Sequence, residues 1–230
     1  MDILYHWNYA LFLAINGLAG AYAWLDSLMA FCADYLIFCW PILLLLIWGL
    51  PLAWKQRTLS SAQAALLQRR RSAVLWVPIA CLIAYGLNLF IELFVFEPRP
   101  FVTHHNAHLL ISHAADSAFP SDHTAWSFAV FGVLLFILVP ALFAARRGAS
   151  EDAKVPKGEV LWQAVLVGVA FVVACSIGFA RVFVGVHYPG DVLGGALDGL
   201  VAGAIAALLF HVLRRLTDIV LRFARQIRLA

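Results

Sequence analysis

The chain has very few charged residues. Only 13% of its 230 residues are Asp, Glu, Lys or Arg, against about 25% in an average soluble domain. Hydrophobic residues make up 63% of the sequence, where a soluble domain has about 45–50%. This excess excludes a water-soluble protein of this size. The net charge of +3 is too small to suggest a nucleic-acid partner.

The chain also has few cysteines, and their spacing forms no recognisable pattern. They lie inside apolar runs, without a CxxC pair, at Cys32, Cys39, Cys81 and Cys175. This excludes a disulfide framework and a zinc-binding motif, and it indicates small hydrophobic side chains in the protein interior. The N-terminus lacks the basic start and the small-residue cleavage site of a signal peptide, so we expect no processing.

Long apolar runs, in contrast, are frequent. A helix needs about 20 apolar residues to cross the hydrocarbon core of a membrane. Five runs meet this requirement, and they cover residues 29–54, 73–96, 121–145, 160–183 and 191–213. A weaker run at 7–24 contains Asn8, Asn16 and glycines; six spans are favoured over five spans plus an interfacial helix. No internal repeat or low-complexity tract divides the chain. We therefore predict an all-α, polytopic membrane helical bundle of about six transmembrane helices, formed by one domain over residues 1–230.

The basic residues indicate how these helices are oriented. Fourteen of the 16 lysines and arginines fall in the connections 55–71 and 146–157 or in the C-terminal segment 214–228. These segments alternate along the chain, so they share one side of the membrane, which is the cytoplasmic side by the positive-inside rule. Arg99 and Arg181 remain on the opposite, outer side. An ionisable residue at the end of a span is a candidate functional residue, although a lone arginine also fits simple contact with lipid headgroups.

Two outer segments hold the polar residues that suggest chemistry. They cover residues 97–123 and 181–191, and they lie at the outward ends of four predicted spans. If these helix ends pack together, six side chains share one pocket, namely Arg99, Ser121, His123, Arg181, His187 and Asp191.

Such a pocket suits a phosphoryl group. The two arginines offer planar forks of donors for phosphate oxygens. Ser121 precedes a long apolar run, where a helix N-terminus adds free amides and a positive dipole. Two histidines can divide the roles of nucleophile and general acid. Asp191 follows His187 by four residues and can hold one ring nitrogen while the other attacks. Taken singly, His123 and Asp191 also fit plain helix-capping roles, but the combination favours a site.

Three short motifs then match a known family. The sequence contains Arg99-Pro100, Pro120-Ser121-Asp122-His123 and Arg181-x5-His187-x3-Asp191. In order, they resemble the K-x6-RP, PSGH and SR-x5-H-x3-D motifs of the type-2 phosphatidic-acid phosphatase superfamily. The resemblance implies a phosphatase that needs no metal or other cofactor and forms a phosphohistidine intermediate. It implies that His187 is the nucleophile, Asp191 its orienting partner and His123 the acid for the leaving group. It also implies that phosphate is held by Arg99, Ser121 and Arg181.

The sequence departs from these motifs at three positions. Glu92 stands where the family has lysine, Asp122 where it has glycine, and Ala180 where it has serine. An ionised carboxylate cannot donate to phosphate, so Glu92 removes or replaces one phosphate contact, and Asp122 places a carboxyl near the phosphate-binding residues. Both are kept as candidate substrate-binding residues. Glu92 can pair with Arg99, because seven residues are about two helical turns; a solvated or capping acid is the alternative.

Within the superfamily, the segments 98–103 and 119–123 look like the bacitracin-resistance type of undecaprenyl-diphosphate phosphatase. This resemblance implies dephosphorylation of undecaprenyl diphosphate at the outer face of the bacterial cytoplasmic membrane, which recycles the lipid carrier of cell-wall synthesis. A phosphatase of glycerolipid phosphates, such as phosphatidylglycerol phosphate, or a lipid phosphotransferase stays open as an alternative. The motifs contact the phosphate and not the lipid tail, so they do not separate these substrates.

A membrane metal-binding or transport protein is a further alternative. His104 and His105 lie in the outer loop and are candidate metal ligands. However, an adjacent histidine pair in a polar loop often lacks the fixed geometry of a metal site. A transporter would place its ionisable residues near the middle of the membrane. We therefore expect no metal, and the only partners that the sequence indicates are the lipid phosphate substrate and the membrane lipids.

Overall fold

The computed structural model describes residues 2–53, 61–147 and 157–227. Within these ranges the chain is helical, and its β-pairing is limited to an isolated antiparallel bridge between Pro98 and Ser117. The elements are, in order, α1 (Asp2–Asn16), α2 (Ala23–Asp34), the 3-10 helix η1 (Leu36–Phe38), α3 (Cys39–Ala53), α4 (Ser61–Glu92), α5 (Pro100–Thr103), α6 (Asp122–Arg147), α7 (Lys157–Phe183), α8 (Pro189–Val212) and α9 (Arg214–Gln226). The prediction of an all-α fold is confirmed.

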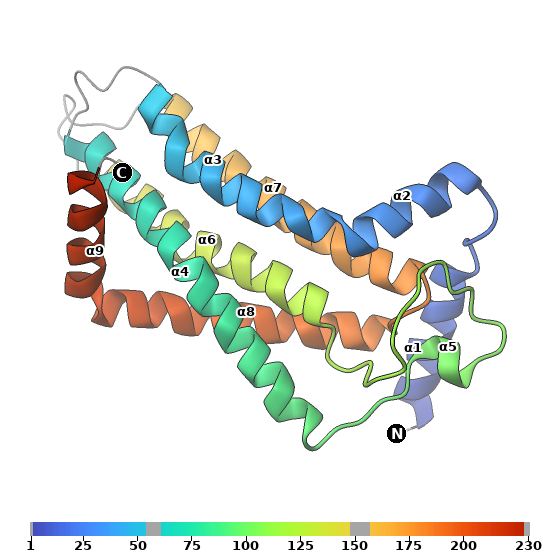
Figure 1. Ribbon diagram of the computed structural model, residues 1–230. Helices are drawn as coiled ribbons and strands as arrows, with labels where there is room; N and C mark the ends of the chain where they lie inside the picture. Colours follow the sequence, from blue (N-terminus) through green and yellow to red (C-terminus); the bar gives the residue numbers. More distant parts are fainter. Residues whose placement is uncertain (1, 54–60, 148–156, 228–230) are drawn as a thin grey trace.

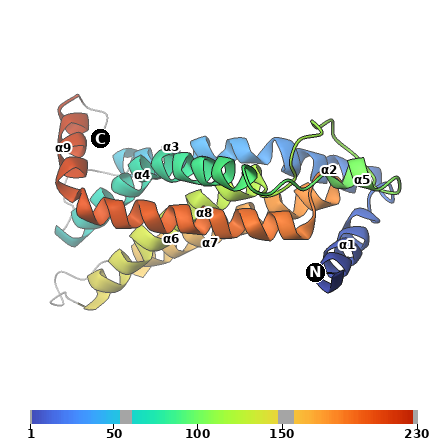
Figure 2. The same cartoon turned by 90° about the horizontal axis from the view of Figure 1, so that it is seen from below.

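The long helices α3, α4, α6, α7 and α8 run alongside one another and form a bundle (Figures 1 and 2). Helix α6 contacts α4, α7 and α8, so it is the central helix of the bundle. Four helices are long and apolar enough to cross a membrane, and they cover Gln63–Glu92, Asp122–Phe143, Val160–Phe183 and Pro189–Val212. A fifth crossing results if Ala23–Asp34 and Leu36–Gly49, which are bent by 50° at their junction, count as one span.

The predicted number of about six spans is therefore approximate. The run 7–24, favoured as the sixth span, is not among the candidate spans of the described residues. Helix α1 has 15 residues and ends at Asn16, which makes it about 22 Å long, too short for a hydrocarbon core of about 30 Å. It lies at one end of the bundle, near α5 (Figure 1).

Closely packed small residues join α6 to α8. Gly195, Gly199 and Gly203 recur every fourth residue on one face of α8. A side chain at Gly199 would collide with the backbone of Ala125, and one at Gly203 with the backbone of Gly132. Small residues let helix backbones approach in this way within membranes. A side chain at Gly195 would likewise collide with the backbone of Ser121, so these contacts hold α8 against α6 from the start of α6 to the middle of the bundle.

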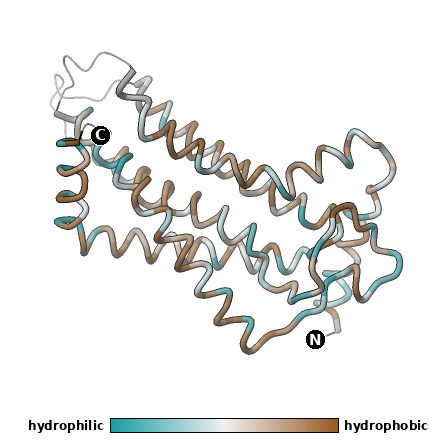
Figure 3. Tube along the Cα trace, viewed as in Figure 1, coloured by the Kyte–Doolittle hydropathy of each residue, from teal (hydrophilic) through white to brown (hydrophobic). Residues whose placement is uncertain are grey.

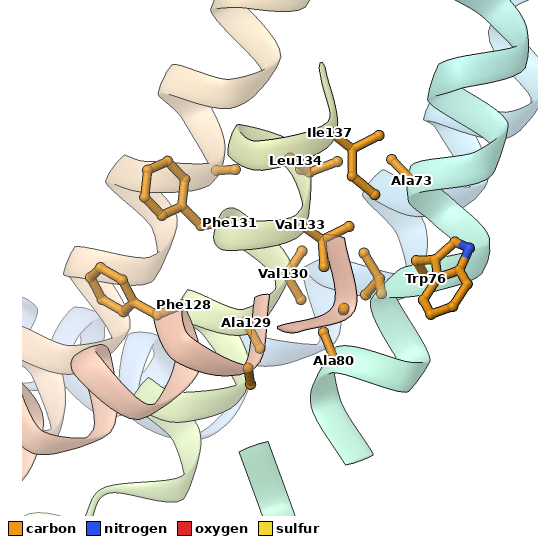
Figure 4. Close-up of a cluster of buried hydrophobic side chains, with 14 of the residues drawn as sticks. Ala73, Trp76, Ala80, Phe128, Ala129, Val130, Phe131, Val133, Leu134 and Ile137 are labelled. Carbon is orange, nitrogen blue, oxygen red and sulfur yellow. The ribbon is translucent and has the colours of Figure 1, made fainter. Parts of the chain in front are cut away.

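The interior of the bundle is apolar. Its largest cluster includes Trp76 and Ala80 of α4 together with Val130, Val133 and Ile137 of α6 (Figure 4). Burial of an aliphatic side chain stabilises a fold by about 1.5–3 kcal/mol in water, and dispersion between packed side chains continues to contribute in lipid. This cluster fixes the relative positions of the helices, and the polar loops extend from the ends of these helices.

The outer surface of the bundle is also apolar, as expected for a lipid-facing surface. Large side chains such as Leu45, Leu82 and Leu208 are exposed on the long helices, along which hydrophobic residues predominate (Figure 3). All four cysteines are free. Three of them are half-buried and Cys175 is exposed, so the prediction of interior cysteines holds only in part. The reason is that an apolar residue on a span can face lipid as readily as the core.

The two ends of the bundle differ. One end carries α1, α5 and the loops around them, and the other end carries α9 (Figure 1). Helix α9 lies across α8 and contains Arg214, Arg215, Arg222 and Arg225. Of the other basic residues used to predict orientation, Lys55, Arg57, Lys154 and Arg228 lie outside the described residues.

Candidate active site

Arg99 lies between α4 and α5 and is only 5% exposed. Its Nε atom donates a hydrogen bond to Oδ1 of Asp116 at 2.7 Å, and its Nη2 donates to the carbonyl of Ser117 at 3.0 Å. Its Nη1 donates to the carbonyl of Val186 at 2.9 Å and lies 3.2 Å from Nε2 of His187. These contacts fix the guanidinium directly beside the histidine ring.

His187 is 2% exposed and lies in the turn before α8. Its Nδ1 atom is 2.8 Å from the carbonyl oxygen of Ala118 and 3.5 Å from Oδ2 of Asp191. A carbonyl only accepts hydrogen bonds, so Nδ1 carries the proton and Nε2 keeps its lone pair. Burial, followed by the charges of Arg181 and Arg99, holds the pKa of His187 well below its usual range. The ring is therefore neutral at pH 7, as a nucleophile requires.

Asp191 is completely buried in the first turn of α8. Its Oδ2 accepts a hydrogen bond from the backbone N–H of Tyr188 at 2.7 Å, and its carbonyl accepts one from the N–H of Ser121 at 3.1 Å. The side chain thus caps α8, and the backbone joins α8 to α6. The predicted contact with His187 exists, but the carbonyl of Ala118 is the nearer acceptor for the ring.

The PSDH segment forms the start of α6. Ser121 stands immediately before the helix, and its Oγ accepts a hydrogen bond from the hydroxyl of Thr124 at 3.1 Å. His123 follows in the first turn, half-buried. Arg181 and His187 lie close enough to His123 to interact with it electrostatically. The structure thus brings together Ser121, His123 and His187, as the sequence predicted.

Asp122 is turned toward a neighbouring helix. Its Oδ1 accepts a hydrogen bond of 2.6 Å from the side-chain amide of Asn88 in α4. The carboxyl of Asp122, which stands where the family has glycine, therefore has a hydrogen-bond partner. Its charge nevertheless acts on Arg181, so Asp122 borders the site.

Arg181 lies in the last turn of α7 and is 1% exposed. Its Nη1 donates to Oδ1 of Asp34 at 3.2 Å and to the carbonyl of Ala33 at 3.4 Å. Its Nε atom is buried without a hydrogen-bond partner among the described residues. The end of α2 therefore holds one side of the guanidinium, and the other N–H groups remain for a ligand.

Glu92 is not brought into contact with Arg99. It is the last residue of α4, its side chain is exposed, and within the described part of the chain it forms no hydrogen bond or ion pair. The guanidinium of Arg99 pairs with Asp116 instead. The hypothesis of a Glu92–Arg99 pair is wrong because α4 ends at Glu92, so the spacing of two helical turns does not continue to Arg99.

The outer-loop histidines are separated. His104 stacks on Tyr9 with ring centroids 4.0 Å apart, whereas His105 is exposed. In the ranges that the structure describes, no group of three or more His, Cys, Asp or Glu residues is placed to hold a metal ion. His113 lies closer to the site, with its ring centroid 6.4 Å from that of His187. Burial, and then the charges of Arg99 and Arg181, lower its pKa.

Helix α1 anchors the loops of the site through two asparagines. Asn16 donates to the carbonyls of His108 and Phe183, each at 2.8 Å, and accepts from the N–H of His108 at 2.8 Å. Asn8 accepts from the N–H of Gly190 at 2.8 Å. These are the polar residues that weakened the prediction of a span at 7–24. Their side-chain amides form hydrogen bonds with the backbone of the active-site loops, and this role accounts for polar residues within an apolar run.

Sequence reasoning missed three contributors to the site. The carbonyl of Ala118 leaves no signal in the sequence, because every residue has one. Asp34 lies 147 positions from Arg181; a lone acid between the apolar runs of α2 and α3 was the available signal. Glu97 was recognised only as the first residue of an outer segment, yet its carboxyl forms a hydrogen bond with that of Asp191.

Comparison with known proteins identifies the family. The model of the PAP2 superfamily matches residues 73–217, which is more than half of the chain and includes all three motifs. This chain belongs to the PAP2 superfamily. The resemblance inferred from the motifs is confirmed, and so is the prediction that the chain is a phosphatase. The matched range contains Arg99, His123 and His187.

Curated relatives cover nearly the whole PAP2 chain. The undecaprenyl-diphosphatase BcrC of Bacillus subtilis is 34% identical over 94% of this chain and 90% of that protein. The BcrC protein of Bacillus licheniformis, named a bacitracin transport permease, is 31% identical over 85% of this chain and 76% of its own length. The putative undecaprenyl-diphosphatase YbjG of Escherichia coli is 28% identical, with coverages of 90% and 84%.

Two solved structures share the fold of this PAP2 protein. LpxE of Aquifex aeolicus has a TM-score of 0.54 and 23% identity, and covers 86% of this chain and 93% of its own. A PAP2-type phosphatidylglycerolphosphate phosphatase of Bacillus subtilis has a TM-score of 0.55 and 20% identity, with coverages of 92% and 88%. At these identities the comparison shows the fold alone. The shared fold is consistent with a multi-pass membrane protein.

Proposed function

We propose that this protein removes the terminal phosphate of undecaprenyl diphosphate through a phosphohistidine on His187. The arrangement of His187 carries the proposal: its proton is on Nδ1, facing Ala118, and its free Nε2 lies beside Arg99. The 34% identity to a protein named undecaprenyl-diphosphatase supports the choice of substrate.

In the first step, Nε2 of His187 attacks the terminal phosphorus. A bond forms between nitrogen and phosphorus, and the bond to the bridging oxygen breaks, so undecaprenyl phosphate leaves. His123 donates a proton to the leaving oxygen. An anionic substrate beside His123 favours the protonated form that this role requires. In the second step, water attacks the phosphohistidine, His123 accepts the water proton, and inorganic phosphate is released.

The arginines neutralise the charge of the transferred group. The guanidinium of Arg99 makes four contacts with protein atoms, and one of them is with Nε2 of His187, the attacking nitrogen. When the phosphate of the substrate reaches Nε2, this last contact is broken, and Nη1 of Arg99 donates its hydrogen bond to a phosphate oxygen instead. Arg181 is held by Asp34 on one side and keeps its buried Nε for phosphate. Fixed donors of this kind act most strongly in a water-poor site.

We also propose that the site faces the outside of the bacterial cytoplasmic membrane and that residues 1–230 act as one domain. Helix α9, with its four arginines, lies at the end of the bundle opposite the site (Figure 1), and basic segments remain in the cytoplasm. Asp34 of α2 contacts Arg181, and Asn16 of α1 binds the backbone of Phe183, two residues after Arg181. These contacts support a function that needs the N-terminal helices.

Substrate choice is tested with purified protein and a panel of lipid phosphates, in buffer with excess EDTA. Phosphate release should be fastest from undecaprenyl diphosphate and should persist in EDTA, because two arginines and a helix N-terminus can neutralise the phosphoryl charge without a cation. A preference for phosphatidylglycerol phosphate would replace this substrate with a glycerolipid. Loss of activity in EDTA that a divalent ion restores would contradict the metal-free mechanism.

The proposal has a cellular consequence. Bacitracin sequesters undecaprenyl diphosphate, so faster removal leaves less target. Overproduction in a sensitive bacterium should raise bacitracin tolerance, and the His187→Ala variant at equal abundance should not. Equal tolerance with both proteins would show that the effect does not depend on catalysis.

A further inference from the structure

Glu97 occupies a fixed position between the motif residues. It follows the end of α4 and stands two residues before Arg99. Its carbonyl accepts a hydrogen bond of 2.7 Å from the N–H of Ala118, and its own N–H is 3.4 Å from Oγ of Ser117. The next residue, Pro98, forms the isolated bridge with Ser117. Glu97 is thus paired with the backbone segment whose carbonyl holds His187.

The side chain of Glu97 meets a second carboxyl. It lies within hydrogen-bonding reach of the carboxyl of Asp191, whose Oδ2 is already occupied by the N–H of Tyr188 at 2.7 Å. Oδ1 of Asp191 is buried, and no N–H group of the described residues donates to it. Two ionised carboxylates have only acceptors, so a hydrogen bond between them requires one proton.

Of the two carboxyls, Glu97 is the one that carries the proton below about pH 7. Burial, followed by the negative charge of Asp191 and their hydrogen bond, raises the pKa of Glu97 to about 7. Two negative charges this close cannot both be present without a large electrostatic cost. Glu97 therefore carries a proton below about pH 7, where an exposed glutamate is ionised.

We propose that Glu97 is a positioning residue of this phosphatase: its protonated carboxyl donates a hydrogen bond to Asp191 and holds that carboxylate beside the ring of His187. The residue acts through Asp191 and does not touch the phosphate. The inference rests on the proposed role of His187 as nucleophile. It adds a third member to the histidine–aspartate pair and makes the alignment of that pair depend on pH.

His123, as the general acid, also loses activity as the pH rises, but this loss is common to wild type and to any Glu97 variant. The other charged groups beside the pair add no dependence of their own near neutrality. Tyr188, at the start of α8, has a pKa raised by burial to about 12, and His187 remains neutral because its pKa is far below the usual range. The guanidinium of Arg99 also faces this pair, with its Nη1 3.2 Å from Nε2 of His187. Although burial opposes it, the hydrogen bond from Arg99 holds the pKa of Asp116 below its usual range, so this carboxylate remains ionised.

The direction of the effect follows from the raised pKa of Glu97. Below about pH 7 the proton is present and the bridge to Asp191 is intact. As the pH rises through this value, Glu97 ionises, loses its donor and repels Asp191. The turnover of the wild-type enzyme should therefore fall on the alkaline side. A glutamine at this position keeps an N–H donor at every pH and should remove this contribution.

The test is the pH profile of kcat and KM for undecaprenyl diphosphate, measured from about pH 5.5 to about pH 9. Glu97→Gln should retain turnover within about three-fold of wild type at about pH 6 and extend its alkaline limb by about one pH unit or more. Glu97→Ala should lower kcat about ten-fold across the range with a smaller change in KM. The matched control is Asp26→Asn, because this outer carboxylate bonds the backbone of Gly20; its profile should equal that of wild type. A Glu97→Gln profile that matches wild type would overturn the proposal.

A second measurement reads the proton directly and needs no turnover. Infrared spectroscopy of the purified protein should show the carbonyl band of a protonated carboxyl that disappears as the pH rises through about 7. This band should be absent from Glu97→Gln and present in Asp26→Asn. If wild type shows the band but hydrolyses no lipid phosphate, the proposed function fails and the shared proton stands. If wild type is active and the Glu97→Gln spectrum equals that of wild type, the shared proton is contradicted.

Discussion

The Nδ1 atom of His187 lies 2.8 Å from the carbonyl oxygen of Ala118, closer than its 3.5 Å distance to Oδ2 of Asp191. A backbone acceptor therefore fixes the tautomer of the ring, and the aspartate adds negative charge beside it. Ala118 is itself held in place by the hydrogen bond from its N–H to the carbonyl of Glu97. The orientation of the nucleophile thus depends on a backbone contact that no side-chain substitution removes directly.

Asp191→Asn should reduce activity without abolishing it. The ring keeps its hydrogen bond to Ala118, and an asparagine oxygen can still accept from the N–H of Tyr188. We expect kcat/KM to fall by about 10- to 100-fold, because the carboxylate charge that stabilises the ring is lost. Asp191→Ala also removes the cap of α8 and should lower stability by about 0.5–2 kcal/mol. Steady-state kinetics and thermal unfolding separate the two effects. An Asp191→Asn variant as inactive as His187→Ala would show that the backbone contact is not sufficient.

Asp34→Asn should weaken substrate binding. Asp34 provides the carboxylate that holds Arg181, at 3.2 Å from its Nη1. Without this charge the guanidinium is less well fixed, and we expect KM for the diphosphate to rise about ten-fold with a smaller change in kcat. Asp26→Asn, in the same helix α2, is the matched control and should behave like wild type. Equal kinetics of the two variants would contradict the role given to Asp34.

His123→Ala should slow reactions with poor leaving groups more than those with good ones. A general acid contributes about 10²- to 10⁴-fold when the leaving oxygen needs a proton. Comparison of phenyl phosphate with p-nitrophenyl phosphate as substrates measures this dependence, because nitrophenolate leaves without protonation. His6→Ala, an exposed histidine of α1, should leave both rates unchanged. Equal losses on both substrates in His123→Ala would remove His123 from the role of acid.

The sequence predicted the parts of the site that lie within short motifs. Arg99, Ser121, His123 and His187 converge because each stands at the end of a span, and span ends on one side of a membrane share one layer. The Glu92–Arg99 pair failed because the end of α4 was not predicted. Contacts between distant segments, such as Asp34 with Arg181, depend on how helices pack in three dimensions, and no local pattern encodes that packing.

The predicted number of about six spans is approximate for a related reason. Hydropathy measures composition over a window, and the run 7–24 is apolar enough to resemble a weak span. The structure ends α1 at Asn16 because the side chain of this residue binds the backbone at His108 and Phe183. A polar residue with partners in a distant loop looks the same in a sequence as a polar residue inside a span.

The outward orientation of the site can be tested in intact cells. In a chain whose four cysteines are replaced by alanine, Ser112→Cys places a thiol in the exposed loop beside the site. A membrane-impermeant thiol reagent should label this cysteine without lysis, and it should label Ser150→Cys only after lysis, because basic connections stay in the cytoplasm. Labelling of Ser150→Cys but not of Ser112→Cys in intact cells would reverse the orientation.

The central claim is that Nε2 of His187 becomes phosphorylated during turnover, and trapping the phosphoenzyme tests it most directly. Purified wild-type protein and His187→Ala are mixed with undecaprenyl diphosphate labelled in the terminal phosphate, quenched in alkali within one turnover, and digested for peptide mapping. We predict a phosphate bound to the peptide that contains His187, stable in alkali and released by acid as expected for a phosphoramidate, and no label in His187→Ala. Hydrolysis by His187→Ala at a rate near that of wild type, or label on a different residue, would contradict the mechanism.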